Sequence, residues 1–138
     1  MKVLIADDDR LIRTMVRDLL AELGHAAVEA SNGTEAVAAC EREAPDVLIL
    51  DLLMPRLSGL DALHALRAKG VRAPAVLLSA ISGRSVRGLD GAEAVDVLLE
   101  KPVTRQGLAR ALERALRGAG APPPGPRSAE RWRSGDKP

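Results

Sequence analysis

Aromatic residues are almost missing from this chain of 138 residues, which contains one Trp and neither Phe nor Tyr. A hydrophobic core must therefore be built from aliphatic side chains. Single-stranded nucleic acid would also find no aromatic surface on which its bases could stack. Because the formal net charge is only +1, no general electrostatic attraction to nucleic acid is expected. The composition thus predicts a chain with no nucleic-acid partner.

Cysteine and long apolar runs are scarce as well. The single cysteine, Cys40, cannot form an internal disulfide, so nothing indicates an oxidising compartment. No segment approaches the ~18 apolar residues of a membrane-spanning helix. The apolar run before Asp7 is too short for a secretory signal and leads into three acids. We therefore expect a cytoplasmic protein with no membrane partner, in which Cys40 packs in the core.

Apolar segments of two kinds alternate along the chain. Short runs that are apolar throughout are typical of strands buried on both faces, whereas apolar residues three or four positions apart indicate amphipathic helices. A glycine-containing segment lies between the last two strands. The order predicts an α/β fold with a parallel sheet covered on both faces. The predicted strands are residues 2–6, 26–30, 47–50, 75–78 and 97–99, and the clearest helices are residues 11–23, 34–42, 60–67 and 103–116.

The chain has room for one domain of ordinary size. From Gly118 onward the sequence consists mostly of Pro, Gly and Arg, a composition that cannot bury enough apolar surface to fold. We expect a domain over residues 1–117 and a disordered tail over residues 118–138. A tail of that length and composition has no room for a DNA-binding helix-turn-helix domain.

Polar residues stand where the predicted strands end. Asp7–Asp9 follow the first strand, Asp51 ends the third, Ser79 ends the fourth and Lys101 follows the fifth. In open α/β sheets, ligands bind at the carboxyl ends of the strands. An acid cluster, a further acid, a hydroxyl and an amine are therefore expected at one edge of the sheet.

This set of groups suits phosphoryl transfer. Carboxylates from two strand ends can hold a hard cation such as Mg²⁺. A cation, an ammonium group and a hydroxyl can together stabilise the oxygens of a transferring phosphoryl group, which is most of what this reaction asks of a protein. Asp51 would be the nucleophile and would form an aspartyl phosphate.

Each residue also has an ordinary explanation. Acids favour helix N-termini, which accounts fully for Asp9 as a cap. A single Asp after a strand is commonly a turn residue, and Lys101 could be a surface lysine. His25 and His64 could be phosphohistidines or metal ligands, but they lie on segments away from the predicted site and are interpreted as surface or packing residues. The convergence of four groups at strand ends favours the phosphoryl site over these separate explanations.

Over about residues 1–117, the chain closely resembles the response-regulator receiver domain of two-component signal transduction, with a stand-alone, chemotaxis-regulator-like architecture. The resemblance implies a flavodoxin-like (βα)5 fold, that is, a doubly wound five-stranded parallel sheet of strand order 2-1-3-4-5. Four motifs in the right order carry it: Val3-Leu4-Ile5-Ala6-Asp7-Asp8-Asp9, Asp51-Leu52-Leu53-Met54-Pro55 with Gly59, Leu78-Ser79-Ala80, and Lys101-Pro102.

The resemblance also implies roles and partners. The phosphodonor would be a histidine kinase or a histidine phosphotransfer protein, and a downstream protein would dock on the phosphorylated form. The chain would not be an enzyme but a phosphoacceptor that assists its own phosphorylation and dephosphorylation. The implied site comprises Asp51 as phosphoacceptor; Asp7, Asp8, Asp51 and the backbone carbonyl of Leu53 as ligands of Mg²⁺ or Mn²⁺; Ser79 as switch hydroxyl; Lys101 as phosphate-binding residue; and Pro102 after a cis peptide bond.

The chain departs from this family at three places. Leu98 stands where the family usually has Tyr or Phe, so the usual aromatic switch is absent. Leu53 and Ile81, two residues after Asp51 and Ser79, are apolar, which predicts a long-lived aspartyl phosphate because no polar side chain orients water there. Glycine weakens a helix by ~1 kcal/mol relative to Ala. We therefore expect phosphorylation to change the order of residues 82–95, which contain Gly83, Gly88 and Gly91.

The same residues bear on other possible functions. A relay shuttle between two histidine proteins is a close variant of the receiver reading. A receiver-like interaction module that needs no phosphate is disfavoured by the intact acids and Lys101. A nucleotide-binding oxidoreductase wants a glycine-rich turn where Asp7–Asp9 stand. An aspartate-nucleophile phosphatase could use Asp7 and Asp9, but Asp51 and Lys101-Pro102 fit it poorly.

Overall fold

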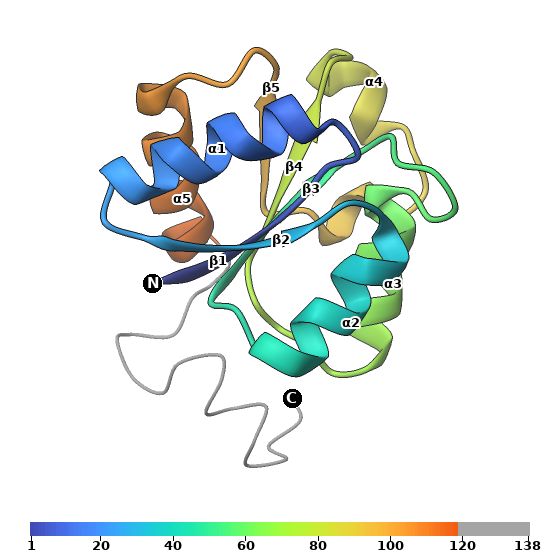
Figure 1. The fold of residues 1–138 in the computed structure, drawn as a ribbon. Helices are drawn as coiled ribbons and strands as arrows, with labels where there is room; N and C mark the ends of the chain where they lie inside the picture. The colour runs from blue at the N-terminus through green and yellow to red at the C-terminus, as the bar shows by residue number, and fades with distance from the viewer. Residues whose placement is uncertain (119–138) are drawn as a thin grey trace.

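The computed structural model describes residues 1–118. Five parallel strands form one sheet in the order β2-β1-β3-β4-β5 (Figure 1). This order and the doubly wound α/β fold class confirm the prediction. The strands are β1 (Lys2–Ala6), β2 (Ala26–Ala30), β3 (Val47–Asp51), β4 (Ala75–Ser79) and β5 (Val97–Glu100).

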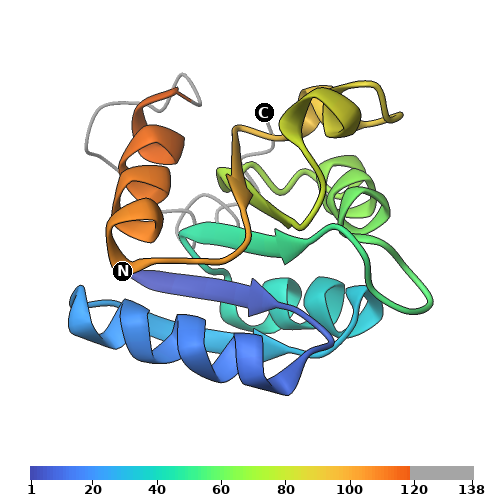
Figure 2. The ribbon, with the colours of Figure 1, turned by 90° about the horizontal axis from the view of Figure 1, so that it is seen from above.

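Helices cover both faces of the sheet. In Figures 1 and 2, α1 and α5 lie on one face, and α2, α3 and the short α4 lie on the other. A single turn of 3-10 helix, η1, precedes the last strand. Their bounds are α1 (Arg10–Glu22), α2 (Gly33–Glu43), α3 (Gly59–Ala68), α4 (Gly83–Arg87), η1 (Ala92–Ala94) and α5 (Arg105–Gly118).

The last helix begins later than residue 103, where the apolar spacing placed it. Val103 precedes α5 and is buried in the core. The Thr104 hydroxyl accepts a hydrogen bond from the Gly107 amide (3.0 Å), as an N-cap does. Helical geometry therefore begins at Arg105, and the apolar contact of Val103 belongs to the connection before it.

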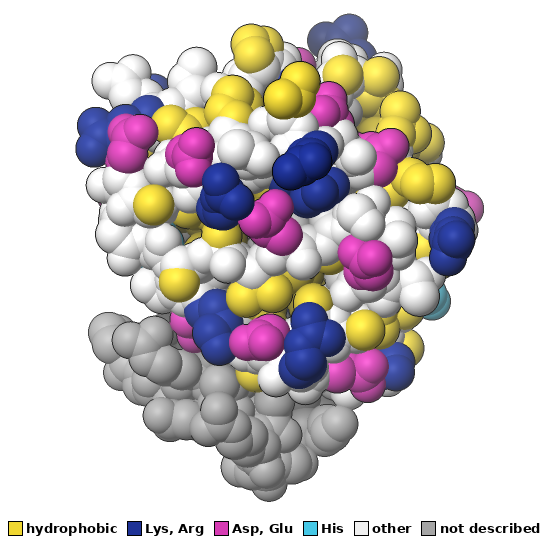
Figure 3. All heavy atoms as spheres, in the orientation of Figure 1, with side chains coloured by type: hydrophobic (Ala, Val, Ile, Leu, Met, Phe, Trp, Pro, Cys, Tyr) yellow, Lys and Arg dark blue, Asp and Glu magenta, His cyan; other side chains and the backbone are white. Residues whose placement is uncertain are grey.

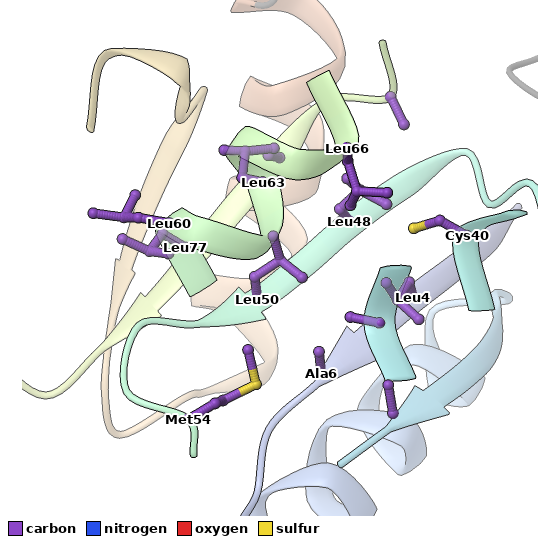
Figure 4. Packing of buried hydrophobic residues seen from close by; sticks show 14 of the residues in the cluster. Leu4, Ala6, Cys40, Leu48, Leu50, Met54, Leu60, Leu63, Leu66 and Leu77 are labelled. Carbon is purple, nitrogen blue, oxygen red and sulfur yellow. The ribbon is translucent and has the colours of Figure 1, made fainter. Parts of the chain in front are cut away.

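The core is aliphatic and has two halves, one on each face of the sheet. Every residue of β3 and β4 is buried, as expected for central strands of a parallel sheet. Alternate residues point to opposite faces. Leu48 and Leu50 pack towards α2 and α3 (Figure 4), whereas Ile49 packs towards α1 and α5. Cys40 is fully buried in the first half, which confirms its predicted packing role.

Because all strands run in parallel, their carboxyl ends meet along one edge of the sheet. The first turns after these strands therefore bring segments that are distant in the sequence together at this edge.

Within residues 1–118, no helix is long and apolar enough to cross a membrane. The predicted tail, residues 118–138, lies outside the described residues from position 119 onward.

Candidate functional site

The register of the sheet brings the predicted polar residues together. Ala6 pairs with Leu50 across β1 and β3, so Asp7 and Asp51 are neighbours at the sheet edge. On the other side, the Lys101 amide donates to the Ser79 carbonyl (2.8 Å), which joins the ends of β5 and β4. The four strand ends thus form one site, as the sequence predicted.

Three carboxylates crowd this site. Asp7, Asp8 and Asp51 each offer an oxygen, and these oxygens lie within 4.8 Å of one another. Asp7 and Asp51 are buried, while Asp8 is exposed. The buried Asp7 Oδ2 atom accepts no hydrogen bond within residues 1–118, but it forms an ion pair with the Lys101 amine at 3.2 Å. Like charges at this spacing repel, and hard oxygen ligands open to water on one side fit Mg²⁺ or Mn²⁺.

Lys101 lies between the two buried carboxylates. Its Nζ is 3.2 Å from Asp7 Oδ2 and 3.3 Å from Asp51 Oδ1. Burial by itself lowers the pKa of Lys101, but the two carboxylates outweigh that effect, and the net pKa is raised. The amine therefore stays protonated at neutral pH, which places one fixed cation beside three acids.

Asp51 is the acid whose ionisation is most disfavoured. Burial, and then the negative charge of Asp7, raise its pKa to about 6, although Lys101 acts in the opposite direction. A second cation in the cluster would favour the charged form of Asp51. Nucleophilic attack by a carboxylate requires that form.

The turn after β1 is fixed by hydrogen bonds to the amide, the carbonyl and one carboxylate oxygen of Asp7. The Asp7 amide donates to the Ala30 carbonyl (3.1 Å), and Asp7 Oδ1 accepts from the Asp9 amide (2.8 Å). The Asp7 carbonyl accepts from Nη1 of Arg13 (2.7 Å). The Asp9 side chain accepts from the Leu11 amide (2.9 Å) and caps α1, which confirms its predicted role.

Arg13 is a site residue that the sequence motifs did not predict. A signal was available, because helical side chains point back towards the N-terminus of their helix. A long side chain in the first turn of α1 can therefore reach the end of β1.

The turn after β3 is seated equally firmly. The Gly59 amide donates to the Leu52 carbonyl (3.0 Å), and a Cβ on Gly59 would lie only 2.3 Å from the Asp51 carbonyl oxygen. Only glycine fits at that distance. Met54 is buried in the core and anchors the turn (Figure 4). Leu53, between these fixed points, has its side chain 68% exposed.

Ser79 and Leu98 occupy the side of the site nearest α4. The Ser79 hydroxyl donates to the Ile81 carbonyl (3.1 Å) and accepts from the Ile81 amide (3.0 Å), so it is satisfied by its own turn. Leu98 is half-buried and packs on the core, and its Cδ2 would be 2.9 Å from a Cβ on Gly83. The Lys101–Pro102 peptide bond is cis.

The two histidines lie outside this cluster. His25 precedes β2 at the opposite end of the sheet, where its Nδ1 is 3.2 Å from the N-terminal amine. His64 is exposed on α3. Neither belongs to the group of potential metal ligands formed by Asp7, Asp8 and Asp51.

The sequence of the chain matches that of a known protein family. Residues 3–113 match the family model of the response regulator receiver domain. The chain belongs to this family. It is a receiver domain of two-component signalling, and this membership does not favour the alternatives of a phosphate-independent interaction module or a relay shuttle.

Curated relatives of this receiver include the response regulators MprA of Mycobacterium leprae (strain TN) and Mycobacterium avium (strain 104). They are 37% identical over 119 residues and 36% identical over 119 residues, respectively. The matches cover 85% of this chain but 51% of each relative, so the receiver spans about half their length.

Solved structures show the same fold. The Francisella response regulator 1452 receiver domain is 31% identical, with a TM-score of 0.74 over 84% of this chain and 97% of that one. The chemotaxis protein CheY4 of Vibrio cholerae is 30% identical, with a TM-score of 0.75 over 83% and 98%. The response regulator TrrA of Thermotoga maritima, solved with Mg²⁺ and BeF, is 30% identical, with a TM-score of 0.76 over 83% and 98%.

Proposed function

We propose that Asp51 of this receiver accepts a phosphoryl group from a phosphohistidine of a histidine kinase or phosphotransfer protein, in a reaction that requires Mg²⁺ or Mn²⁺. The observation that carries the proposal is the cluster itself. Three carboxylate oxygens lie within 4.8 Å of one another, and Lys101 contacts the two that are buried.

In the transfer, a carboxylate oxygen of Asp51 attacks the phosphorus atom. The bond from phosphorus to the donor imidazole nitrogen breaks, and its electron pair stays on that nitrogen, which is then protonated. Lys101 stabilises the phosphoryl oxygens by charge. The Ser79 hydroxyl donates to another phosphoryl oxygen after leaving the Ile81 carbonyl.

Asp7, Asp8, Asp51 and the backbone carbonyl of Leu53 would hold the metal ion. When bound, the ion supplies positive charge next to the phosphoryl oxygens. It also favours the ionised Asp51 at neutral pH. Both effects depend on the closeness of the Asp7, Asp8 and Asp51 carboxylates, which would hold the ion beside Asp51.

The proposed output is docking of a downstream protein on the phosphorylated receiver, not an enzymatic activity of the chain. Leu98 offers no aromatic ring to turn inward behind Ser79. The segment 82–95 is the proposed responding element, and Gly83 lies so close to Leu98 that a Cβ on this glycine would be 2.9 Å from Leu98 Cδ2. Residues 118–138 are proposed to be a tail that the phosphoryl chemistry does not need.

Phosphoryl labelling tests the assignment of Asp51. With acetyl phosphate and Mg²⁺, the wild-type chain should gain one phosphoryl group, and Asp51→Asn should gain none. A chelator should abolish labelling of the wild type. Asp9→Asn is the matched control, because it makes the same chemical change in the turn after β1, at the N-cap of α1, and Asn caps a helix as well as Asp does. Labelling of Asp51→Asn at wild-type stoichiometry would contradict the proposal.

A further inference from the structure

Arg13 holds the peptide group between the first two acids of the site. We infer that Arg13 is a positioning residue, which orients Asp7 and Asp8 for the metal ion without binding the ion itself. The inference rests on the proposed function, since it concerns the same metal site.

The contact of Arg13 is with the backbone. Its Nη1 donates to the Asp7 carbonyl at 2.7 Å, a short bond for a charged donor. Fixing this carbonyl fixes the plane of the Asp7–Asp8 peptide, and therefore the direction in which the Asp8 side chain leaves the chain. Within residues 1–118, the exposed Asp8 carboxylate makes no hydrogen bond or ion pair that would orient it otherwise.

The guanidinium is itself held from a second element. Its Nε lies 3.4 Å from Glu29 Oε1 on β2, and the other carboxylate oxygen of Glu29 lies 3.3 Å from Arg17 Nη1. The Arg13 side chain is only 16% exposed, whereas that of Arg17 is 48% exposed. β2 is paired with β1 along its whole length. Arg13 thus links Glu29 on β2 to the turn after β1, which carries the acids.

Arg13 and Lys101 act differently although both are cations near the acids. Lys101 contacts the carboxylate oxygens of Asp7 and Asp51, so it neutralises charge where the metal binds. Arg13 contacts a backbone carbonyl and Glu29 and leaves those oxygens free. Its two contacts are made by different nitrogens, Nη1 and Nε, which suits the guanidinium of Arg and not the single nitrogen of Lys.

Charge and positioning predict opposite results when Arg13 is removed. By Coulomb's law alone, loss of a cation near the acids strengthens binding of Mg²⁺. Loss of a positioning residue weakens it. In metal sites, removing such a supporting partner typically costs about 10-fold to 100-fold in affinity.

Calorimetric titration of the full chain with Mg²⁺ distinguishes these results. Arg13→Met keeps the apolar stem and removes charge and donors, and its Mg²⁺ affinity should fall about 10-fold. Arg17→Met is the matched control, because it removes the same charge from the same helix and the same partner Glu29. Its affinity should be unchanged or slightly higher. Arg13→Lys retains the charge and should fall between wild type and Arg13→Met.

Each outcome decides the inference. Melting of the metal-free variants shows whether they fold, and a merely structural role would lower that midpoint without changing the Mg²⁺ affinity of the folded protein. If Arg13→Met binds Mg²⁺ as tightly as wild type or more tightly, the inference about Arg13 is overturned, but the proposed function is not. If Arg13→Met does not fold, wild-type affinity in Arg13→Lys would overturn it. A wild-type chain that binds no Mg²⁺ would overturn the proposed function and the inference together.

Discussion

The turns that carry the acids and the segment that follows β4 lie at the same edge of the sheet but are built differently. After β1, the amide, carbonyl and one carboxylate oxygen of Asp7 all have hydrogen-bond partners. After β4, α4 has five residues, and its one buried residue is Val86. Leu89, in the same segment, is 41% exposed. On the proposed function, the acidic turn is therefore held in place before phosphorylation, and the segment 82–95 is the part expected to respond.

Over α1 and α2, acidic and basic side chains are interspersed, with no large region of one sign (Figure 3).

A five-residue helix such as α4 is far too short to be stable without tertiary packing. Shifting a two-state segment from 1:99 to 99:1 takes about 5.5 kcal/mol. The proposed responding segment, residues 82–95, consists of short helical elements and packs on the core through Val86, Ala94 and Val95.

Glycine substitution gives the largest expected contrast between the two regions. Gly59→Ala should lower the free energy of unfolding by about 3 kcal/mol or more, because its Cβ would lie 2.3 Å from the Asp51 carbonyl oxygen. Gly88→Ala should raise it by roughly 0.4–1 kcal/mol, since φ there is −83° and the nearest atom to a Cβ is 3.7 Å away. Urea unfolding of both variants measures the effects. Equal losses would remove the distinction between a tight and a loose region.

Ionisation of Asp51 should make the metal-free protein less stable as pH rises. Its folded pKa is about 6, above the unfolded value of ~3.9. The stabilising contribution is therefore fully present below pH ~4 and is lost as pH rises through about 6, with a total loss of about 3 kcal/mol. In the presence of a chelator, Asp51→Asn should thus be more stable than wild type at pH 8 and equal to it near pH 4.

Unfolding by urea across this pH range measures that difference. Saturating Mg²⁺ should reduce the difference in stability between Asp51→Asn and wild type. A ligand that binds only the native wild-type protein stabilises that protein, by ~2.7 kcal/mol at 100 times Kd. If Asp51→Asn were less stable than wild type at pH 8 without metal, the surroundings of Asp51 would not disfavour its ionised form.

A smaller effect is expected on the lifetime of the phosphorylated form. Leu53 is 68% exposed beside the site and has no group that could orient water. Leu53→Asn should therefore hydrolyse its aspartyl phosphate several-fold faster than wild type. Leu116→Asn, an exposed leucine on α5, is the control. Decay of the phosphorylated protein after removal of the donor measures this, and slower decay in Leu53→Asn would contradict it.

Much of the fold and the site followed from the sequence because both depend on strand ends. Continuous apolar runs located the strands, and parallel strands must bring Asp7, Asp51 and Lys101 to one edge. What the sequence missed depends on side-chain reach and on turn conformation. The bond from Arg13 to the Asp7 carbonyl and the local pairing of Ser79 are of this kind.

The segment after β4 also differs from its expected form. The sequence suggested that three glycines soften one helix, but only Gly83 lies within α4. Gly88 is at its C-cap, and Gly91 has φ of 88° and precedes η1. The weakness of this segment therefore comes from the shortness of its helical elements and not from several glycines inside one helix.

Amide hydrogen exchange of the whole chain tests the comparison most directly. It would be measured without metal, with Mg²⁺, and with Mg²⁺ and beryllofluoride as a phosphoryl mimic. We predict that the turns at residues 7–9 and 52–58 gain protection with Mg²⁺ alone, and that residues 82–95 change only when the mimic is added. Unchanged protection over residues 82–95 with the mimic, alongside a clear change elsewhere, would contradict the account.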